Sequence, residues 1–264
     1  MPTIDENKRT WDGDYNWANR GDEWSAPWGG PSMQWYGTIF PRIKSHVPTA
    51  RILEIACGYG RWTEFLKDLC KNLVVVDLSE ECVQACRERF SSCSHIEYHV
   101  NDGKSLDLLP DSSVDFVFSF DSLVHADESV MKAYLGQFRR ILNSDGVAFI
   151  HHSNLGEYQS TYSRIRRVPG LERLLKQVGV LEKSLHGRDP GVSAAKVAAL
   201  AEEHGLRCIT QEIITWGKKR MLMDCLSTIV RSDSSRAGIN HTMRNKNFER
   251  EVRGLFQISQ LYGD

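Results

Sequence analysis

The feature that most constrains the fold is an alternation of apolar, strand-like runs with helix-like segments between residues 51 and 151. The strand-like runs cover residues 51–56, 73–77, 95–100, 113–120 and 147–151. Residues 73–77 are almost continuously apolar, which is typical of a parallel strand buried on both faces. Five strands alternating with helices predict a doubly wound parallel sheet, and right-handed crossovers then place helices on both of its faces.

The chain after residue 152 follows a different pattern. A polar stretch at 154–190 precedes a helix predicted over 193–204, and residues 206–216 and 220–230 form two strand-like runs joined by a short turn. Strands joined so closely pair antiparallel. The sequence therefore predicts a Rossmann-like α/β fold with a doubly wound, seven-stranded, mostly parallel sheet and an antiparallel edge hairpin.

Segments of different character flank this α/β region. Residues 1–50 contain five tryptophans among glycines and polar residues, which is too aromatic for a disordered tail. We expect them to form a cap that packs on the main domain or on a ligand. Residues 51–230 form the main domain, with a lid inserted at about 154–190, and residues 231–264 are predicted to form a polar tail or helix.

The overall composition excludes some classes of protein. The chain of 264 residues has a formal net charge of -1, which gives no electrostatic reason to expect a nucleic-acid partner. Runs of about 18 apolar residues are absent, so we expect no membrane span, and the first residues lack the apolar core of a signal peptide. The seven cysteines show no paired zinc-ligand spacing. We therefore expect a cytoplasmic protein with reduced thiols, and the oligomeric state stays open.

The strongest motif is the run Glu-Ile-Ala-Cys-Gly-Tyr-Gly, from Glu54 to Gly60, between the first strand and the first helix. Glycines allow a sharp turn there and let a ligand approach the backbone without a Cβ clash. The helix that follows presents free N–H groups at its N-terminus. Glu54 lies inside an apolar strand, where a carboxylate is costly unless it is paired. In an open α/β sheet this loop lies at the carboxyl ends of the strands, where ligands bind.

Polar residues also follow the next strands. Asp77 ends the second strand, where an acid can accept hydrogen bonds from both hydroxyls of a ribose. Asn101-Asp102-Gly103 follows the third strand, where a carboxylate or amide can face an adenine amino group. Simpler interpretations stay open. Asp77 could only cap the next helix, although Ser79 fills that position, and Asn-Asp-Gly is also a common turn sequence.

The Glu-x-x-Cys-Gly-x-Gly loop, the acid after strand two, the Asn-Asp-Gly after strand three and the final hairpin resemble class I S-adenosylmethionine-dependent methyltransferases over roughly residues 50–230. Ala56-Cys57 replaces the commoner pairing in the loop. The resemblance implies S-adenosylmethionine as the cofactor, with Gly58 and Gly60 along its methionine part and Asp77 on its ribose. It also implies that Leu78 contacts the adenine and that Asp102 binds the adenine amine. The other cofactor contacts that we predict are Glu54, Ala56, Gly103, Phe120 and, from the N-terminal cap, Trp35.

A nicotinamide-dependent dehydrogenase is the main alternative for this loop. Its fingerprint requires Gly-x-Gly-x-x-Gly, but Thr63 occupies the position of the third glycine. The missing glycine and the antiparallel hairpin favour the methyltransferase. A binding domain that has lost its chemistry is a further alternative, and the complete cofactor motif argues against it.

His125 and Asp121 are the predicted catalytic residues, because residues 120–125 follow the fourth strand beside the expected methyl group. The segment lacks the Asn/Asp-Pro-Pro-aromatic run that many methyltransferases acting on nucleobase or amide nitrogens carry. A histidine with an ordinary pKa near 6.5 suits removal of a hydroxyl proton, and Asp121 either orients His125 or caps a helix. The segment is similar to that of bacterial small-molecule and sugar methyltransferases. It predicts O-methylation of a sugar, glycan end or related metabolite, with N- or C-methylation by positioning alone as the alternative.

Four further residues are predicted to contact the substrate. His151 and His152 end the fifth strand on the substrate side of the sheet, and adjacent strand residues point to opposite faces, so we predict no metal site there. A divalent-cation site would need Asp121 or Asp224 to join a histidine, and this alternative stays open. Tyr158 and Arg188 belong to the predicted lid, where arginine can bind a phosphate or carboxylate. A solvated surface is the alternative for the charged residues of this lid.

Overall fold

The computed structural model describes residues 3–177, 187–216 and 221–262. Its centre is one mixed sheet with the strand order β3-β2-β1-β4-β5-β7-β6-β8. The strands are β1 (Thr49–Ile55), β2 (Cys70–Asp77), β3 (Ile96–Val100), β4 (Val114–Ser119), β5 (Leu142–Ser153), β6 (Leu206–Ile214), β7 (Asp224–Arg231) and β8 (His241–Asn245). The first five strands run parallel, and β7 runs antiparallel to both β5 and β6. The predicted α/β fold with a mostly parallel sheet and an antiparallel hairpin is confirmed.

The prediction of seven strands is wrong, because the described residues form eight. The additional strand, β8, lies in the segment that we expect to be a polar tail, and four of its five residues are exposed. Such a strand lacks the apolar alternation by which strands are found in a sequence. Backbone pairing with β6, from Thr210–His241 to Ile214–Asn245, holds it in place. β8, and not the hairpin, therefore forms this edge of the sheet.

Ten α-helices are present in the described residues. They are α1 (Ile4–Arg9), α2 (Pro31–Gln34), α3 (Phe40–Ile43), α4 (Thr63–Leu66), α5 (Glu80–Arg89), α6 (Glu128–Ile141), α7 (Gln159–Arg166), α8 (Leu171–Gln177), α9 (Ala194–Glu203) and α10 (Arg253–Ser259). α6 illustrates how sequence sets these boundaries. Its N-cap Asp127 accepts a hydrogen bond from the Val130 N–H at 2.9 Å, and its buried residues recur at three- and four-residue intervals from Val130 to Ile141.

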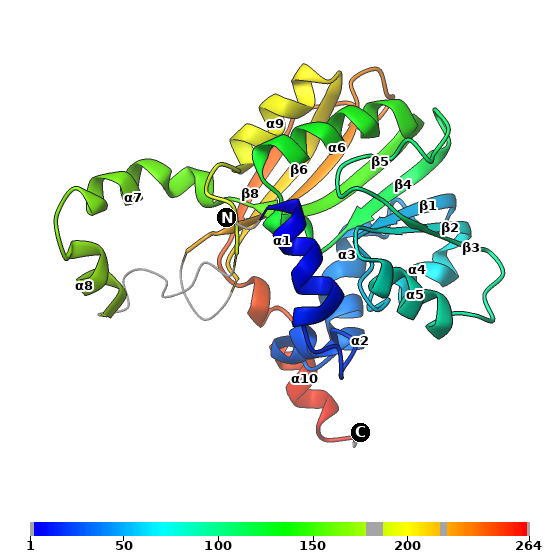
Figure 1. Ribbon diagram of the computed structural model, residues 1–264, viewed down its shortest axis with the longest axis horizontal. Coiled ribbons are helices and arrows are strands. Elements are labelled where there is room, and N and C mark those ends of the chain that lie inside the picture. The colour runs from blue at the N-terminus through cyan, green and yellow to red at the C-terminus, as the bar shows by residue number, and fades with distance from the viewer. Residues whose placement is uncertain (1–2, 178–186, 217–220, 263–264) are drawn as a thin grey trace.

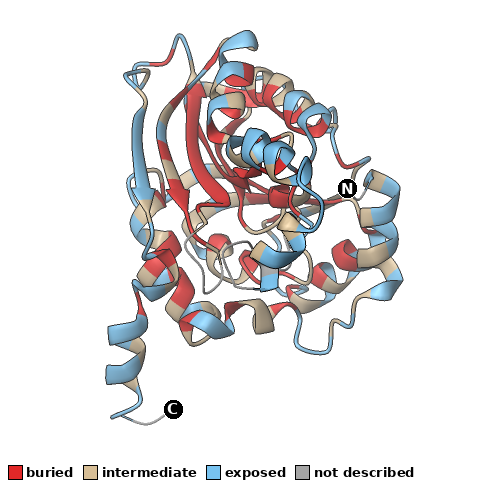
Figure 2. Cartoon of the chain, turned by 90° about the vertical axis from the view of Figure 1, so that its left-hand side faces the viewer, coloured by how far each residue is buried: buried red, intermediate tan, exposed pale blue. Residues whose placement is uncertain are grey.

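Helices cover both faces of the sheet (Figure 1). α6 and α9 lie together on one face, over a core that includes Leu135 and Phe138. α3 and α4 cover the other face, where Trp35, Ile39 and Ile43 join the strands in a second core. Buried residues concentrate in the strands and on the inner sides of these helices, whereas α10 is largely exposed (Figure 2).

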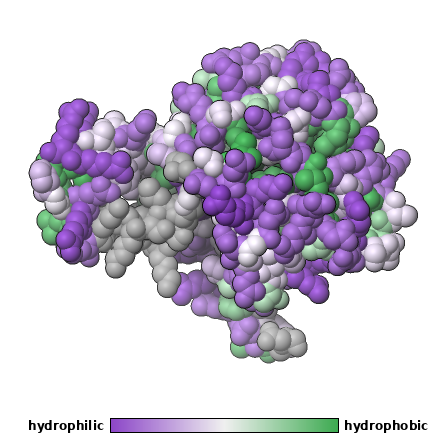
Figure 3. All heavy atoms as spheres, viewed as in Figure 1, coloured by the Kyte–Doolittle hydropathy of each residue, from purple (hydrophilic) through white to green (hydrophobic). Residues whose placement is uncertain are grey.

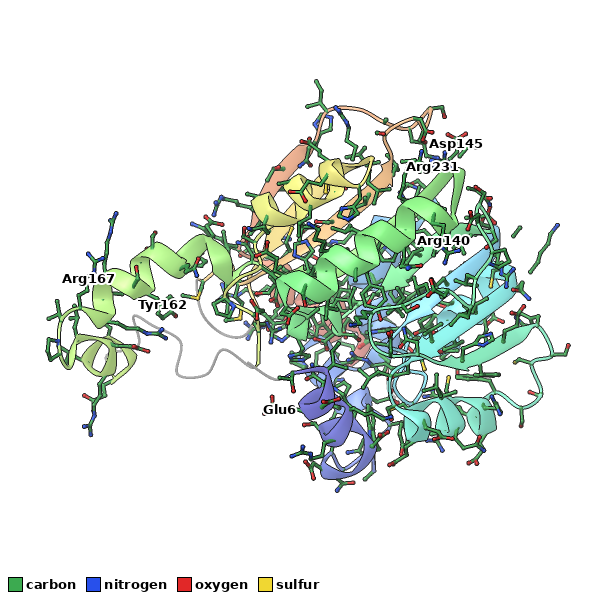
Figure 4. The ribbon with its side chains drawn as sticks, turned by 45° about the horizontal axis from the view of Figure 1, so that its top comes forward. Glu6, Arg140, Asp145, Tyr162, Arg167 and Arg231 are labelled. Atoms are coloured by element: carbon green, nitrogen blue, oxygen red, sulfur yellow. The ribbon has the colours of Figure 1, made fainter. Side chains whose placement is uncertain are left out.

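The N-terminal segment reaches the carboxyl end of the parallel strands. Arg140, Asp145 and Arg231 mark the opposite end of the sheet, and Glu6 of α1 lies far from them (Figure 4). α7 and α8, which belong to the predicted lid, project away from the body of the protein instead, with Arg167 on the projecting part (Figures 1 and 4). The carboxyl end of the sheet is therefore covered by the N-terminal segment and not by residues 159–177.

The polarity of the surface and the length of the helices can be compared with the expectations from the sequence. The face seen in Figure 3 is largely hydrophilic, with apolar residues in small separate areas. Over the part of the chain that the structure describes, none of the helices is long and apolar enough to cross a membrane.

Candidate active site

A cavity lies at the carboxyl ends of β1, β2 and β4. The predicted residues that line it are Ala56, Gly58, Asp77, Leu78, Gly103, Phe120, Asp121 and His125. The N-terminal segment adds further walls, namely Ile4, Asn7, Trp11, Trp17, Arg20 and Trp24. Fold and chain order thus bring most of the predicted cofactor residues to one place.

The loop after β1 owes its shape to three residues with left-handed backbone. Ala56, Gly58 and Gly60 have φ values of 60°, 53° and 83°. A Cβ on Gly60 would lie 2.5 Å from Phe90 Cε2, so only glycine fits there. Gly60 is thus required for packing beneath the loop, whereas Gly58 faces the cavity.

Asp77 connects this loop to the end of β2. Its Oδ2 accepts a hydrogen bond from the Gly58 N–H at 2.9 Å, and its Oδ1 accepts one from the Ser79 N–H at 3.0 Å. Burial raises the pKa of the Asp77 carboxyl above its ordinary value. Ser79 is the N-cap of α5 and accepts from the Cys82 N–H at 3.0 Å, so Asp77 is not needed as a helix cap.

Glu54 lies behind the cavity and not in its wall. The carboxylate is buried and accepts a hydrogen bond from Thr63 Oγ1 at 2.5 Å, which joins β1 to the first residue of α4. Burial raises the pKa of Glu54 to about 8. Glu54 therefore stabilises the loop from below and does not line the cavity.

The loop after β3 presents a different residue from the one predicted. Asp102 is exposed, and its Oδ1 accepts from the N–H groups of Lys104 and Ser105 at 3.0 and 2.6 Å. Asn101 and Gly103 line the cavity instead. The turn interpretation of Asn-Asp-Gly therefore describes the Asp102 side chain better than an adenine contact does.

Trp35 lies in the core and away from the cavity. It is 1% exposed, and its ring stacks on Phe65 with centroids 4.9 Å apart. The apolar residues Ile39 and Ile43 follow it at four-residue spacing, a helical core pattern that predicts this burial. Contrary to the prediction, Trp35 therefore does not line the cavity.

Four tryptophans line the cavity; Trp62 follows the glycine loop, whereas Trp11, Trp17 and Trp24 come from the N-terminal segment, and sequence reasoning does not single these three out. Together with Tyr15 they form one cluster in which all six pairs of ring centroids lie between 4.9 and 5.9 Å apart. We call these four residues the aromatic cluster. Trp11 also lies near His125, with ring centroids 6.2 Å apart. Three of the four residues of the cluster thus form part of the cavity wall.

The two predicted catalytic residues have separate partners. The Asp121 carboxylate pairs with Arg61 Nη2 at 3.0 Å, and this guanidinium lies over the rings of Trp24 and Trp62. Asp127, and not Asp121, caps α6. The prediction that Asp121 orients His125 or caps the helix therefore does not describe the contacts of this carboxylate.

His125 ends the short 3₁₀ turn η5 (Leu123–His125), and its Nδ1 lies 3.3 Å from the carbonyl oxygen of Gly187. A carbonyl only accepts, so Nδ1 carries the proton in this contact and Nε2 is left as the acceptor nitrogen. Burial and the positive charge of Arg188 lower the pKa of His125 from its ordinary 6.5. At neutral pH the ring is therefore uncharged and able to take a proton at Nε2.

The four predicted substrate contacts lie outside the cavity wall and bond to protein groups. His152 contacts the Ser153 carbonyl and Ser227 Oγ at 2.8 Å each, and burial lowers its pKa to about 4. Tyr158 Oη accepts from the Leu222 N–H at 3.2 Å. His151 and Arg188 both contact Asp224. Within residues 3–177, 187–216 and 221–262 we find no group of three His, Cys, Asp or Glu residues placed to hold a metal ion.

The cavity wall fits the chemistry of S-adenosylmethionine. Gly58 and Gly103 line the cavity, and a Cβ on either would approach a side chain of the N-terminal segment, Trp17 at 3.1 Å or Ile4 at 3.2 Å. Each oxygen of Asp77 accepts one N–H and keeps lone-pair capacity for ribose hydroxyls. The aromatic cluster supplies ring faces that attract a sulfonium cation.

The parallel part of the sheet is similar to a known family. Residues 52–146 match the family model described as a methyltransferase domain. Over these residues the chain is similar to methyltransferases. The same match confirms the prediction of a methyltransferase that uses S-adenosylmethionine, at the level of this domain.

Curated relatives match the methyltransferase domain over a limited length. Nodulation protein S from Rhizobium tropici is 28% identical over 100 residues, which cover 38% of this chain and 41% of the relative. Nodulation protein S from Sinorhizobium fredii is 36% identical over 58 residues, 22% of this chain and 27% of the relative. The chain thus spans about two fifths or less of the length of these relatives.

Solved structures show the same fold over most of the chain. The PH0226 protein from Pyrococcus horikoshii has a TM-score of 0.54 and 22% identity, over 84% of this chain and 95% of that protein. An S-adenosylmethionine-dependent methyltransferase from Clostridium acetobutylicum has a TM-score of 0.55 and 14% identity, over 75% of this chain and 91% of that protein. At these identities the likeness establishes the fold.

Proposed function

We propose that this protein transfers the methyl group of S-adenosylmethionine to a hydroxyl of a sugar, glycan end or related small metabolite, with His125 as the general base. The observation that carries the proposal is the His125 ring, which lines the cavity with its Nδ1 engaged by the Gly187 carbonyl. This contact leaves Nε2 as the nitrogen that can accept a hydroxyl proton.

The residues of the cavity wall divide the remaining tasks. Asp77, Gly58 and Leu78 would hold the cofactor, which supplies an electrophilic methyl on a positively charged sulfur. Trp11, Trp17 and Trp24 of the aromatic cluster form one wall of the cavity, and a wall that displaces water strengthens electrostatic contacts beside it. Orientation of the two reactants beside this wall supplies much of the rate acceleration in a direct displacement.

The charge state of His125 supports a hydroxyl acceptor. Because its pKa lies below 6.5, the neutral base predominates at pH 7 without any activating partner. The rate should fall with decreasing pH as His125 is protonated, and the limb should lie below pH 6.5. A nitrogen or carbon nucleophile that needs only positioning predicts a profile without a limb from His125.

The test is a methyl-transfer assay with sugars, nucleotide sugars and phenols as acceptors, on the wild type and on His125→Asn. The Asn amide can still donate to the Gly187 carbonyl but cannot take a proton. Loss of a general base predicts a fall in kcat of about 100-fold or more, with unchanged affinity for S-adenosylhomocysteine. Turnover that survives in His125→Asn contradicts the base assignment. Binding of S-adenosylhomocysteine without turnover on any acceptor favours a non-catalytic binding domain.

A further inference from the structure

A buried carboxylate beyond the cavity wall connects two segments that shape the site. Asp224, the first residue of β7, is 0% exposed. Its two oxygens accept hydrogen bonds from Arg188 Nε at 2.7 Å and Arg188 Nη2 at 2.8 Å. His151 Nε2 lies 3.3 Å from the same carboxylate. This arrangement is a two-point charge-assisted contact, which fixes orientation as well as distance.

His151, beside Asp224, contacts the loop that follows β4. His151 Nδ1 accepts the backbone N–H of Asp121 at 3.1 Å, so Nδ1 is unprotonated and the ring proton lies on Nε2, which is 3.3 Å from Asp224 Oδ2 but outside hydrogen-bond geometry. Asp121 has a φ of 65°, a left-handed backbone that a non-glycine residue adopts only when its surroundings hold it there. The His151 contact contributes to that restraint at the cavity wall.

Arg188, which is bound to Asp224, is connected to His125 through the neighbouring residue Gly187. Arg188 follows Gly187, whose carbonyl oxygen lies 3.3 Å from His125 Nδ1. The next residue, Asp189, is held by Ser153, whose Oγ donates to the Asp189 carbonyl at 2.7 Å. The turn at 187–189 is thus fastened to β7 through Asp224 and to β5 through Ser153.

We propose that Asp224 is a positioning residue for the reaction. Through Arg188 it holds the Gly187 carbonyl against His125, which sets the proton on Nδ1 and frees Nε2. His151, which lies beside the same carboxylate, holds the Asp121 backbone at the cavity wall. Neither Arg188 nor His151 then serves as a substrate contact. The role of His125 as a base rests on the proposed function, but the contacts that Asp224 imposes do not.

The first test is Asp224→Asn, which keeps the size of the side chain and removes its charge. We expect the ¹⁵N NMR signals of His125 to change from one tautomer, with the proton on Nδ1, to a mixture. We expect kcat to fall about 10- to 100-fold, the range typical of residues that orient a functional ligand or base. KM for the acceptor and affinity for S-adenosylhomocysteine should stay within about twofold, because Asp77 and the glycine loop are untouched.

Two companion variants make the result decisive. Asp233→Asn removes an exposed carboxylate just beyond the other end of β7, bound to Arg231 and Arg139, and should leave the His125 tautomer and kcat unchanged. Arg188→Lys keeps the positive charge but loses the two-point contact, so a partial change in the same readouts is expected. If Asp224→Asn does not fold, the same measurements on Arg188→Lys decide.

An unchanged His125 tautomer in Asp224→Asn, or in Arg188→Lys when the first variant is unfolded, overturns the positioning role. A purely structural role predicts that unchanged tautomer together with a lower melting temperature. If the wild type transfers no methyl group but the His125 tautomer still changes in Asp224→Asn, the positioning role stands and the proposed function fails. The two hypotheses are therefore tested separately.

Discussion

The indole ring of Trp17 stacks on the phenol ring of Tyr59, with centroids 4.4 Å apart and planes 7° from parallel. Tyr59 lies between Gly58 and Gly60, so this contact joins the N-terminal segment directly to the loop that is expected to hold the cofactor. A Cβ on Gly58 would meet the same indole at 3.1 Å. Trp17 therefore packs on the loop whose backbone is left-handed at Ala56, Gly58 and Gly60.

Replacing Trp17 should therefore weaken cofactor binding. We expect Trp17→Ala to lower the affinity for S-adenosylhomocysteine about three- to tenfold, the usual worth of one aromatic pair, whereas Trp17→Phe should retain most of it. Calorimetric titration measures both. Tyr36→Ala is the matched control, because that ring is 65% exposed and outside the cavity wall. Equal affinities in Trp17→Ala and the wild type would show that the cluster does not contact the cofactor.

The two aspartates of the predicted cofactor set should behave differently. Asp77→Asn places an amide NH₂ toward an N–H of Gly58 or Ser79 and weakens the ribose acceptor. We expect a 10- to 100-fold loss of affinity for S-adenosylhomocysteine, equivalent to about 1–3 kcal/mol. Asp102→Asn should change the affinity less than about twofold, because that carboxylate accepts from its own loop. The reverse order of effects would restore Asp102 as the adenine contact.

A comparison of Gly60 with Gly170 separates two contributions to the stability lost on substitution, backbone strain and steric clash. Gly60 and Gly170 have similar φ values, 83° and 79°, but a Cβ on Gly170 meets nothing within 4 Å. Gly170→Ala should cost about 1–2 kcal/mol of unfolding free energy from the left-handed backbone alone. Gly60→Ala should cost about 1–3 kcal/mol more, because its Cβ would lie 2.5 Å from Phe90. Urea unfolding of both variants measures the difference, and equal losses would rule out the clash.

Glu54 predicts a specific dependence of stability on pH. Burial raises its pKa from 4.5 to about 8 in the folded protein, so the folded state binds more protons than the unfolded state between these pH values. Stability from this group therefore falls as pH rises from 4.5 to 8. Relative to the wild type, Glu54→Gln should gain stability over that window, on the order of a few kcal/mol. A constant difference in unfolding free energy from pH 4.5 to 8 would mean that Glu54 titrates normally.

Periodicity explains how much of the fold the sequence predicts. The parallel strands, the hairpin and the Ser79 cap each leave a local pattern of apolar spacing or capping residues. β8 leaves none, because its side chains are exposed and backbone pairing alone places it. The wrong prediction of Trp35 in the cavity wall, where the structure places Trp17, has a different cause. Helical spacing with Ile39 identifies Trp35 as a core residue, but no local pattern shows which face of the main domain Trp17 will cover.

The partners of the site residues are harder to predict than the residues themselves. The sequence places Asp77 and His125 at the ends of strands, and the structure brings both to one cavity. The Gly187 carbonyl that contacts His125 comes from 62 residues further along the chain. The Arg61–Asp121 pair likewise joins positions 60 residues apart. Such contacts depend on how loops meet in three dimensions, which neither spacing nor composition records.

The cavity beside the aromatic cluster is expected to bind the adenosyl cofactor. Calorimetric titration of the wild-type protein with S-adenosylhomocysteine, with NAD as the comparison ligand, tests it most directly. The structure predicts saturable one-to-one binding of S-adenosylhomocysteine and none of NAD. Absence of saturable S-adenosylhomocysteine binding, or equally tight binding of NAD, would contradict it.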